Sequence, residues 1–326
     1  MTSSTQSAAT WTDLDSAFER NSSFLISSHV GIDGDCIGSQ LAMYWYLRTK
    51  LGKKVVLFNH DKVPTKFTFL EDSGVLTTDR PSEKFDVAII LDCSNPSRLG
   101  WDGLRDLCGF VVNIDHHRDN VLFGDVNIVK KGGAATGQII YEYFSAKGLA
   151  YPAHVAESLY TAIMTDTGAF RFSNTNSTIL RMCADLSDRG ADCSKIYEMV
   201  YASFSQHGLL LQSRIWSTMT FYEGGAVCSM EMPYSLIDDL GATYGDSEGM
   251  ADLTIIGSGV QVGMLIKYDG RETHFSLRSK GTIDVGKIAQ RIEGGGGHSS
   301  AAGCTMVMPC AQAKAIMLDI IKKELA

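Results

Sequence analysis

One stretch near the middle of the chain decides the fold, and it reads Val111-Val112-Asn113-Ile114-Asp115-His116-His117-Arg118. The apolar run has the pattern of a buried strand, and an acid and two histidines follow it directly. In an open α/β sheet, ligands bind at the carboxyl ends of the strands. If the strand continues through both histidines, their side chains point to opposite sides, so that one can bind a metal while the other faces a substrate. The alternative is a solvated loop that carries two histidines by chance.

The first half of the chain alternates predicted strands with predicted helices. Strands are expected over 24–29, 54–59, 85–91 and 111–114, and helices over 11–21, 36–51, 135–147, 153–165 and 177–189. Phe170 to Thr175 is expected to be a strand or a loop. Strands that alternate with helices indicate a doubly wound, mainly parallel sheet. We therefore predict an α/β domain over residues 1–190.

The second half is predicted to contain a smaller α/β domain, joined to the first by a helical connector. Residues 191–223 have a helical, strand-free pattern, which is typical of a segment between domains. Residues 224–326 alternate strands near 226–232, 260–268, 272–278 and 304–308 with helices near 233–240, 247–256, 284–293 and 310–325. We expect this second domain to close over the first.

Length and composition describe an ordinary globular protein. The chain has 326 residues, 44% of them hydrophobic and 20% charged, which is enough for two separate cores. No apolar run reaches the roughly 18 residues that a membrane span needs, and Met1 to Thr10 lacks the pattern of a secretion signal. The 8 cysteines are scattered without a C-x-x-C pair, which favours reduced thiols in a cytoplasmic protein. The formal net charge of -8 argues against binding to long duplex nucleic acid and permits a small anionic substrate.

Six side chains at or beside predicted strand ends are candidate metal ligands: His29, Asp33, Asp35, Asp92, His116 and Asp166. Without a cation, two carboxylates ~4 Å apart repel by about 4 kcal/mol at an effective dielectric near 20. Two divalent cations would neutralise the four acids, and mixed imidazole and carboxylate ligands suit manganese, iron or cobalt better than calcium. Some of these acids also have ordinary explanations, because Asp35 could cap a helix, Asp92 could cap a turn and Asp166 could be a loop acid. These explanations would all have to hold at once, so we favour a metal site.

The spacing of these residues resembles the motif series of the DHH phosphoesterases. The motifs are His29-x-x-x-Asp33-Gly34-Asp35, Asp92 after a strand, Asp115-His116-His117, and Asp166-Thr167-Gly168. The segment from Gly294 to Gly303 is similar to the glycine-rich signature of the DHH-associated C-terminal domain. The family includes RecJ-type exonucleases, family II inorganic pyrophosphatases and nanoRNase/pAp phosphatases. The glycine-rich segment looks most like the last of these groups.

The resemblance implies a role for each residue of the cluster. One metal ion would be held by His29, Asp33 and Asp92, and the other by Asp35, Asp92, His116 and Asp166. Asp92 would thus bridge the two ions. The catalytic residues would be Asp92, Asp115 and His117, because Asp115 would orient a histidine and His117 would reach the phosphate.

The second domain is expected to bind the rest of the substrate. The glycines from Gly294 to Gly297 are unfavourable in a helix or a strand, and such a run lets backbone N–H groups approach a phosphate. A flexible linker is the alternative. By resemblance, the substrate contacts would be Arg171, Arg278, Ser279, Gly295, Gly296, Gly297 and His298, with Arg98 as a further candidate.

The resemblance implies a manganese-dependent phosphodiesterase and phosphatase. It would hydrolyse short oligonucleotides, including dinucleotides, to mononucleotides, and pAp to AMP and phosphate, by a water activated between two metal ions. A phosphodiesterase of linear or cyclic dinucleotides (pApA, c-di-AMP) is the alternative among enzymes, and a non-catalytic nucleotide-binding module is the alternative outside them. The expected partners are short RNA or DNA oligonucleotides or nucleotide bisphosphates, met in the cytoplasm and away from membranes. Whether the chain forms a homodimer stays open.

Overall fold

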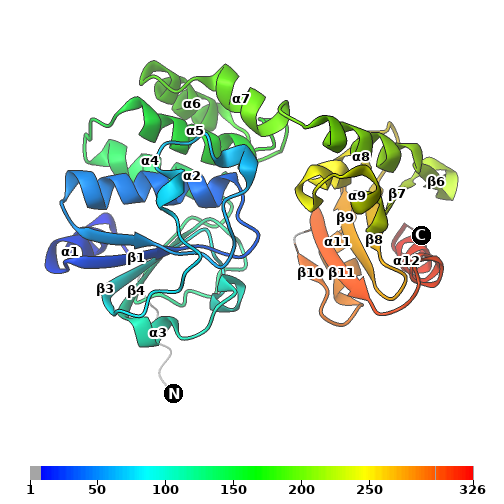
Figure 1. Cartoon of the computed structure of the whole chain (residues 1–326), viewed down its shortest axis with the longest axis horizontal. Coiled ribbons are helices and arrows are strands. Elements are labelled where there is room, and N and C mark those ends of the chain that lie inside the picture. Colours follow the sequence, from blue (N-terminus) through cyan, green and yellow to red (C-terminus); the bar gives the residue numbers. More distant parts are fainter. Residues whose placement is uncertain (1–8, 298, 326) are drawn as a thin grey trace. The chain divides into compact units, whose positions relative to one another are not determined.

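The computed structural model describes residues 9–297 and 299–325, and the chain divides after Ser203 into two compact units. The first unit carries a five-stranded sheet and the second a six-stranded sheet. Figure 1 shows the helices and strands of both units. Among the described residues, no helix is long and apolar enough to cross a membrane. The 8 cysteines, which all lie in the described ranges, are free thiols.

The sheet of the first unit is parallel throughout, as the alternation of strands and helices predicts. Its strands are β1 Ser23–Ser27, β2 Lys54–Leu57, β3 Phe85–Leu91, β4 Cys108–Asp115 and β5 Val126–Val129. Their order in the sheet is β2-β1-β3-β4-β5. In sheets of this order, ligands bind beyond the carboxyl ends of the strands, where the order switches between β1 and β3. His29 follows β1 and Asp92 follows β3, so both lie at that switch.

Long helices cover one face of this sheet, and the short helix α3 with a 3-10 turn covers the other. The helices of the unit are α1 Trp11–Arg20, α2 Gly34–Trp45, α3 Leu104–Leu107, α4 Thr136–Ala146, α5 Ala153–Asp166, α6 Ser177–Asp188 and α7 Cys193–Tyr201. Side chains of α1, α2, α4 and α5 pack on the face that contains Phe24 and Ile89, and Figure 1 shows α2, α4 and α5 on one side of the strands. The opposite face, with Leu25 and Ile90, packs against α3 and the 3-10 turn η4 at Pro96–Leu99.

Two glycines let α2 and α5 pack closely. A Cβ at Gly34 would lie 2.4 Å from the side chain of Thr165, and a Cβ at Gly38 would lie 2.2 Å from the carbonyl oxygen of Ser158. Any larger residue would therefore push the helices apart. The close packing brings the start of α2 next to the end of α5, and each of these helix ends carries an acid of the expected metal site.

The second unit is a mixed sheet with helices on both faces. Its strands run in the order β10-β11-β9-β8-β7-β6, with bounds β6 Thr220–Tyr222, β7 Val227–Pro233, β8 Val262–Tyr268, β9 Thr273–Ser279, β10 Gly296–Gly297 and β11 Ala301–Met306. Within this sheet, only the β7–β8 pair is parallel among the strand pairs of the described residues. The helices are α8 Gln206–Ser217, α9 Ser235–Leu240, α10 Met250–Leu253, α11 Val285–Gln290 and α12 Cys310–Leu325. Helices α11 and α12 pack in one core, and α8, α9 and α10 in another.

The predicted fold class is confirmed, and several elements differ in detail. Strand β5 is missing from the prediction, because a run of four residues has no periodicity that separates it from a loop. The connector is not strand-free, since β6 lies near its end and pairs antiparallel with β7. The glycine run, expected in neither helix nor strand, contributes the short strand β10, which pairs with β11. Phe170 to Thr175, predicted to be a strand or a loop, forms turns, in agreement with the second alternative. Within the connector, α7 contacts α5, whereas α8 contacts α9 and β7.

Candidate metal centre

Asp92 lies at the centre of the acidic cluster, directly after β3. Its side chain is buried and its backbone φ is +53°, a left-handed conformation that is uncommon outside glycine, asparagine and aspartate and recurs at functional sites. Its Oδ2 lies 3.5 Å from His29 Nε2, and its Oδ1 lies 3.4 Å from His116 Nε2. The Thr136 hydroxyl donates to Oδ1 at 3.1 Å, and the Cys36 thiol donates to Oδ2 at 3.3 Å. Each oxygen of this one carboxylate therefore faces a different histidine.

The first group of candidate ligands comprises His29, Asp33 and Asp92, with the Cys36 sulfur beside them. His29 Nε2 lies 3.9 Å from Asp33 Oδ2. Asp33 is also the N-cap of α2, because its Oδ1 accepts from the backbone N–H of Cys36 at 3.0 Å. The ordinary explanation of Asp35 as the helix cap is therefore wrong, since Asp33 has that role.

The second group comprises Asp35, His116 and Asp166. His116 Nε2 lies 3.2 Å from Asp166 Oδ2 and 3.8 Å from Asp35 Oδ2. Asp35 is fully buried and accepts two backbone N–H groups at the start of α4, from Thr136 at 2.6 Å and Gly137 at 2.9 Å. Asp166 is the last residue of α5. It therefore comes from a helix end and not from a strand end or a loop.

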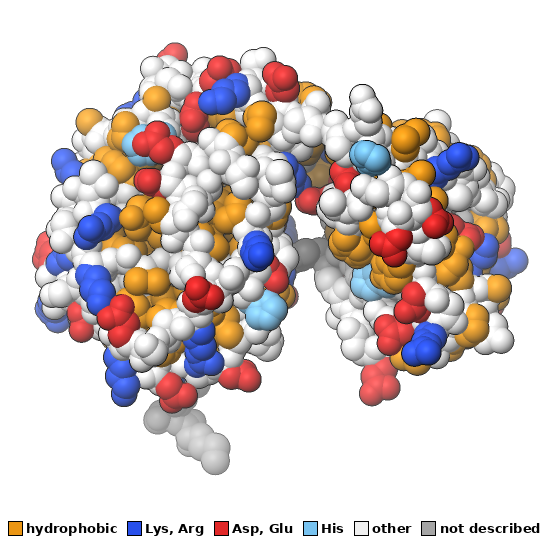
Figure 2. Space-filling view, viewed as in Figure 1, with side chains coloured by type: hydrophobic (Ala, Val, Ile, Leu, Met, Phe, Trp, Pro, Cys, Tyr) orange, Lys and Arg blue, Asp and Glu red, His pale blue; other side chains and the backbone are white. Residues whose placement is uncertain are grey.

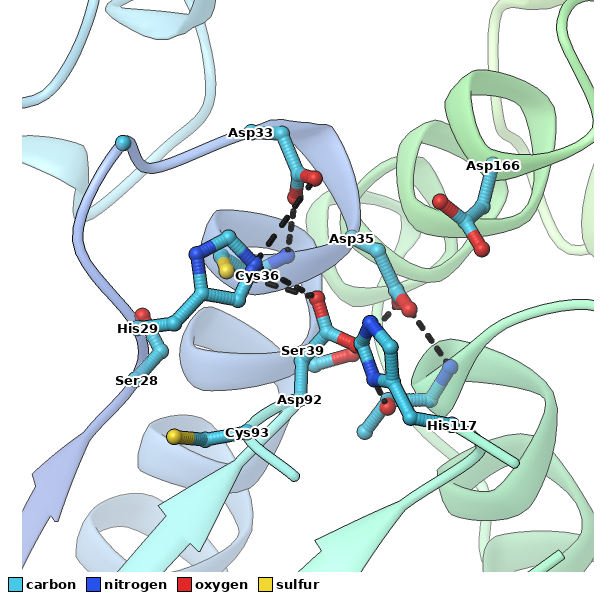
Figure 3. A network of polar contacts seen from close by, with 12 residues as sticks. Ser28, His29, Asp33, Asp35, Cys36, Ser39, Asp92, Cys93, His117 and Asp166 are labelled. Atoms are coloured by element: carbon cyan, nitrogen blue, oxygen red, sulfur yellow. Dashed lines mark hydrogen bonds and ion pairs between the residues drawn. The ribbon is translucent and has the colours of Figure 1, made fainter. Parts of the chain in front are cut away.

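The donor set fits divalent cations. The Nδ1–H of His29 donates to the Val30 carbonyl at 2.7 Å, and that of His116 donates to the Gly133 carbonyl at 2.9 Å. Such a bond fixes the ring and turns Nε2 toward the acids, as in most metal-bound histidines. The nitrogen–oxygen separations of 3.2 to 3.9 Å in the cluster are close to the roughly 3.0–3.4 Å between two ligands that share one ion. Figure 3 shows Asp92 between the two groups.

The histidines and acids of the cluster share protons. Burial and the nearby carboxylates raise the pKa of Asp35 well above its usual value and that of Asp166 to about 7. Burial disfavours the charged histidines, but Asp92 outweighs it and raises the pKa of His29 to about 9 and that of His116 to about 11. Burial also acts against the charge of Asp92, yet the two histidines hold its pKa well below the usual range. Because metal ligands bind in their deprotonated forms, these raised pKa values mean that a divalent cation competes with protons at this centre.

Asp115, the last residue of β4, holds His117 in place. It is fully buried, its Oδ1 accepts from His117 Nδ1 at 2.6 Å, and its Oδ2 accepts from Asn120 Nδ2 at 2.6 Å. Burial would raise the pKa of Asp115, but the bond from His117 lowers it. The rings of His116 and His117 lie 4.7 Å apart. Opposite sides were expected only if the strand continued through both histidines. It does not, because β4 ends at Asp115, and both rings come within 3.6 Å of Asp92 Oδ1.

Several residues that support the cluster were not predicted. Thr136 and Gly137 hold Asp35, Asn120 holds Asp115, and the amide of Asn174 donates to the carbonyl oxygen of Asp166 at 3.0 Å. Thr136 is 101 positions away from Asp35, so no local pattern connects the two. The one available signal was the small residues at the start of the helix predicted over 135–147.

Two family models match this chain: the DHH family, N-terminal domain, over residues 23–163, and the DHHA1 domain over residues 226–326. A curated relative is the bifunctional oligoribonuclease and PAP phosphatase NrnA of Thermus thermophilus. It is 32% identical over 304 residues, which cover 92% of this chain and 89% of that protein. The chain belongs to the DHH family. The resemblance drawn from the motif residues is thereby confirmed.

Solved structures share the fold of this chain. An exopolyphosphatase-related protein of Bacteroides fragilis superposes with a TM-score of 0.88 at 26% identity, covering 96% of this chain and 95% of that one. RecJ of Thermus thermophilus, solved in complex with Mn2+, superposes with a TM-score of 0.52 at 13% identity, covering 97% of this chain and 54% of that one. The second likeness shows a shared fold alone.

Two candidate substrate residues of the DHHA1 domain lie at the end of β9. The Nε of Arg278 lies 2.5 Å from Asp252 Oδ1, so this arginine is already paired with an acid of its own unit. The Ser279 hydroxyl donates to the carbonyl oxygen of Ser299 at 2.9 Å. Both side chains therefore have partners within the domain, and a ligand would have to compete with them.

The glycine run of the DHHA1 domain packs closely against other segments of the same domain. A Cβ at Gly295 would lie 2.1 Å from the carbonyl oxygen of Ala289 in α11. Gly296 and Gly297 pair with β11. A Cβ at Gly297 would lie 2.6 Å from the carbonyl oxygen of Ala301, whereas one at Gly296 would meet nothing within 4 Å. Gly295 and Gly297 are thus needed for packing whatever else they bind. His298, the histidine of the same motif, lies outside the described residues.

The two candidate arginines of the DHH domain lie in turns. Arg171 follows α5, and its Nε donates to the Gly168 carbonyl at 2.6 Å. Arg98 lies in η4, and its carbonyl oxygen accepts from Val30 N–H at 2.7 Å. Val30 is next to His29, so the backbone of Arg98 is linked to the loop that carries one candidate ligand.

Proposed function

We propose that this protein is a metal-dependent phosphoesterase that hydrolyses short oligonucleotides to mononucleotides and pAp to AMP and phosphate. The observation that carries the proposal is the position of Asp92, whose two oxygens face two separate groups of ligands. The relative in Thermus thermophilus is named for both activities. This name supports the choice of substrates.

Two divalent cations, with manganese as the best match to the donors, would occupy the centre. His29, Asp33 and Asp92 would hold one, and Asp35, Asp92, His116 and Asp166 would hold the other. When bound, such a pair lowers the pKa of a water and neutralises charge on an attacked phosphate. Burial and the neighbouring carboxylates raise the pKa of Asp35 and of Asp166, and a bound cation would offset this repulsion.

His117 is the residue we propose for contact with the phosphoryl group. Asp115 accepts the Nδ1–H of His117, which fixes the ring so that Nε2 is the nitrogen offered to substrate. Asn120 in turn holds the second oxygen of Asp115. This chain of bonds gives His117 one orientation before substrate arrives, and an oriented donor costs no rearrangement during the reaction.

We propose that the substrates are small. On the face shown in Figure 2, the described lysine and arginine side chains are mixed with acidic ones and form no continuous basic strip. The net charge of -8 agrees with this, because long nucleic acids require many phosphate contacts. The DHHA1 residues Arg278, Ser279 and Gly295 to His298, together with Arg171, would bind the remainder of the substrate. We place the activity in the cytoplasm, where free thiols persist.

A metal titration combined with a substrate panel tests this function. Metal-stripped protein is titrated with manganese while its melting temperature is followed. At a metal concentration about 1,000 times Kd, the stabilisation is about 4 kcal/mol, which corresponds to about 8–16 °C for a unit of this size. The rates on pAp, a dinucleotide, c-di-AMP and pyrophosphate are then compared, and we expect the first two to be the best substrates. Metal binding without hydrolysis of any of them would instead indicate a nucleotide-binding module.

A further inference from the structure

The turn after Asp166 ends α5 in a defined way. Gly168 N–H donates to the Thr165 carbonyl at 2.9 Å, and Ala169 N–H donates to the Met164 carbonyl at 2.8 Å. These two bonds form a Schellman motif, in which one left-handed residue ends the helix. Gly168, with a φ of +57°, is that residue. The glycine of the Asp166-Thr167-Gly168 motif is thus explained by the helix end.

The left-handed conformation continues beyond what the helix end requires. Ala169 has a φ of +55° and Phe170 a φ of +65°, and both are strained because they carry a Cβ. Strain of this kind persists where the surroundings enforce it, often beside functional sites. The Phe170 ring packs against Tyr160, with ring centroids 6.1 Å apart. It anchors the turn to the core of the DHH domain.

The strained turn places the next aromatic residue, Phe172, on the outside. Its N–H donates to the Thr167 carbonyl at 3.1 Å, and its ring covers Gly168, where an added Cβ would lie 2.5 Å from the ring. The residue is nevertheless 45% exposed. The Arg171 guanidinium carbon lies 5.8 Å from the centroid of the ring. One side of this aromatic ring therefore rests on glycine, while much of the residue faces solvent.

The turn is tied directly to the candidate metal centre. The amide of Asn174 donates to the carbonyl oxygen of Asp166 at 3.0 Å and to that of Ala134 at 3.2 Å. Asp166 is a proposed metal ligand, and Ala134 directly precedes the N-cap of α4, whose first N–H groups hold Asp35. Phe172 lies two residues before Asn174, so these hydrogen bonds also fix the position of Phe172 relative to the acids.

We propose that Phe172, with Arg171 beside it, is a stacking platform for one nucleobase of the substrate. The inference rests on the proposed function, because a phosphate at the acids would bring its attached nucleoside near this turn. Aromatic side chains paired with arginine are common platforms for bases, and stacking tolerates any base because each has a π face. Phe172 thus selects nucleotides over base-free phosphate esters without selecting among the four bases.

The test compares Phe172→Ala with Phe172→Tyr on matched substrates. These are a dinucleotide and its two abasic analogues, each lacking one base. Phe172→Ala should raise KM for the dinucleotide about 10-fold and leave KM nearly unchanged for the analogue that lacks the stacked base. Phe172→Tyr, which keeps the ring, should behave like the native protein. Leu180→Ala, at an exposed apolar position of α6, is the control and should leave all three KM values unchanged.

Two outcomes overturn the platform: an unchanged KM for the dinucleotide, or an equal rise for all three substrates. The manganese-induced rise in melting temperature should be the same in native and variant protein, and its loss in Phe172→Ala would assign the residue a structural role instead. If the native protein hydrolyses none of the substrates, the proposed function fails by itself. Stacking is then still tested by the fluorescence of a 2-aminopurine dinucleotide, which native protein should quench and Phe172→Ala should not.

Discussion

Replacing Asp115 by asparagine should damage activity more than its small change in shape suggests. The carboxylate accepts one hydrogen bond on each oxygen, from His117 Nδ1 and from Asn120 Nδ2, both at 2.6 Å. An asparagine offers one acceptor and one donor. The Asn120 amide cannot simply turn over to compensate, because its Oδ1 accepts from Leu122 N–H at 2.7 Å and its Nδ2 donates to Asn113 Oδ1 at 2.8 Å.

Each orientation of the new amide leaves a mismatch. If its oxygen faces His117, two NH2 groups meet at Asn120 and a buried donor loses its partner, which costs about 1–3 kcal/mol. The bond to His117 also loses its charge, which costs about 1 kcal/mol more. If the oxygen faces Asn120 instead, the NH2 group of the new amide faces His117 Nδ1. Nδ1 must then accept a hydrogen bond, so the proton of His117 moves to Nε2. We expect the unfolding free energy to fall by about 2–4 kcal/mol, and kcat/KM on a dinucleotide to fall about 10- to 100-fold, as for changes next to metal ligands.

The assay is urea unfolding combined with initial rates on the dinucleotide in manganese. Asp185→Asn is the matched control, because Asp185 on α6 is also bonded, to Arg189 and Tyr141, but lies outside the metal centre. It should lose at most about 1 kcal/mol and keep its rate. Asp115→Asn with a rate within twofold of native would refute the role of Asp115 in holding His117.

Three further predictions follow from the same contacts. Asp92→Asn should keep the protein folded, because asparagine tolerates the left-handed backbone. It should reduce the rate of hydrolysis by more than about 100-fold and lower the bound metal measured by elemental analysis. Near-native activity of this variant would exclude a bridging role for Asp92. His116→Ala should lose metal, whereas His117→Ala should keep it and lose kcat and kcat/KM together; equal metal content in the two variants would contradict this division. Two backbone N–H groups, those of Ser22 and Ser23, lower the pKa of Asp86 in the folded protein. The contribution of Asp86 to the unfolding free energy is therefore complete above the unfolded pKa of about 3.9. This contribution is lost as the pH falls through the lower pKa of the folded protein. Asp86→Asn should therefore be less stable than native at pH 7, by about 0.5 kcal/mol for such a solvent-screened group. The difference should shrink as the pH falls below the unfolded pKa, and a constant difference in urea unfolding across this range would exclude the effect.

The fold and the identity of the acids could be predicted from sequence because both depend on local patterns. Strands β3 and β4 are mostly apolar; Asp92 directly follows β3, and Asp115 is the last residue of β4. Parallel strands place such endings at one edge of the sheet, so their convergence follows from topology. The switch between β1 and β3 then brings His29 to the same edge.

The orientation of the side chains could not be predicted, because it depends on contacts between distant segments. Asp35 turns toward the start of α4, and this requires the N–H groups of Thr136 and Gly137, far along the chain. The two histidines share one side because β4 stops one residue before them. Arg278 was expected to bind substrate, but nothing in its neighbourhood in sequence indicates that Asp252 faces it.

Hydrolysis of 5′-labelled RNAs of two to more than ten nucleotides, with manganese and at two salt concentrations, tests most directly whether the substrates are short. We expect the initial rate to be highest for the dinucleotide and to fall as the RNA lengthens. The salt dependence should be modest, because few phosphates are neutralised. Turnover of long RNA that equals or exceeds that of the dinucleotide, with a steep salt dependence, would instead indicate a processive nuclease.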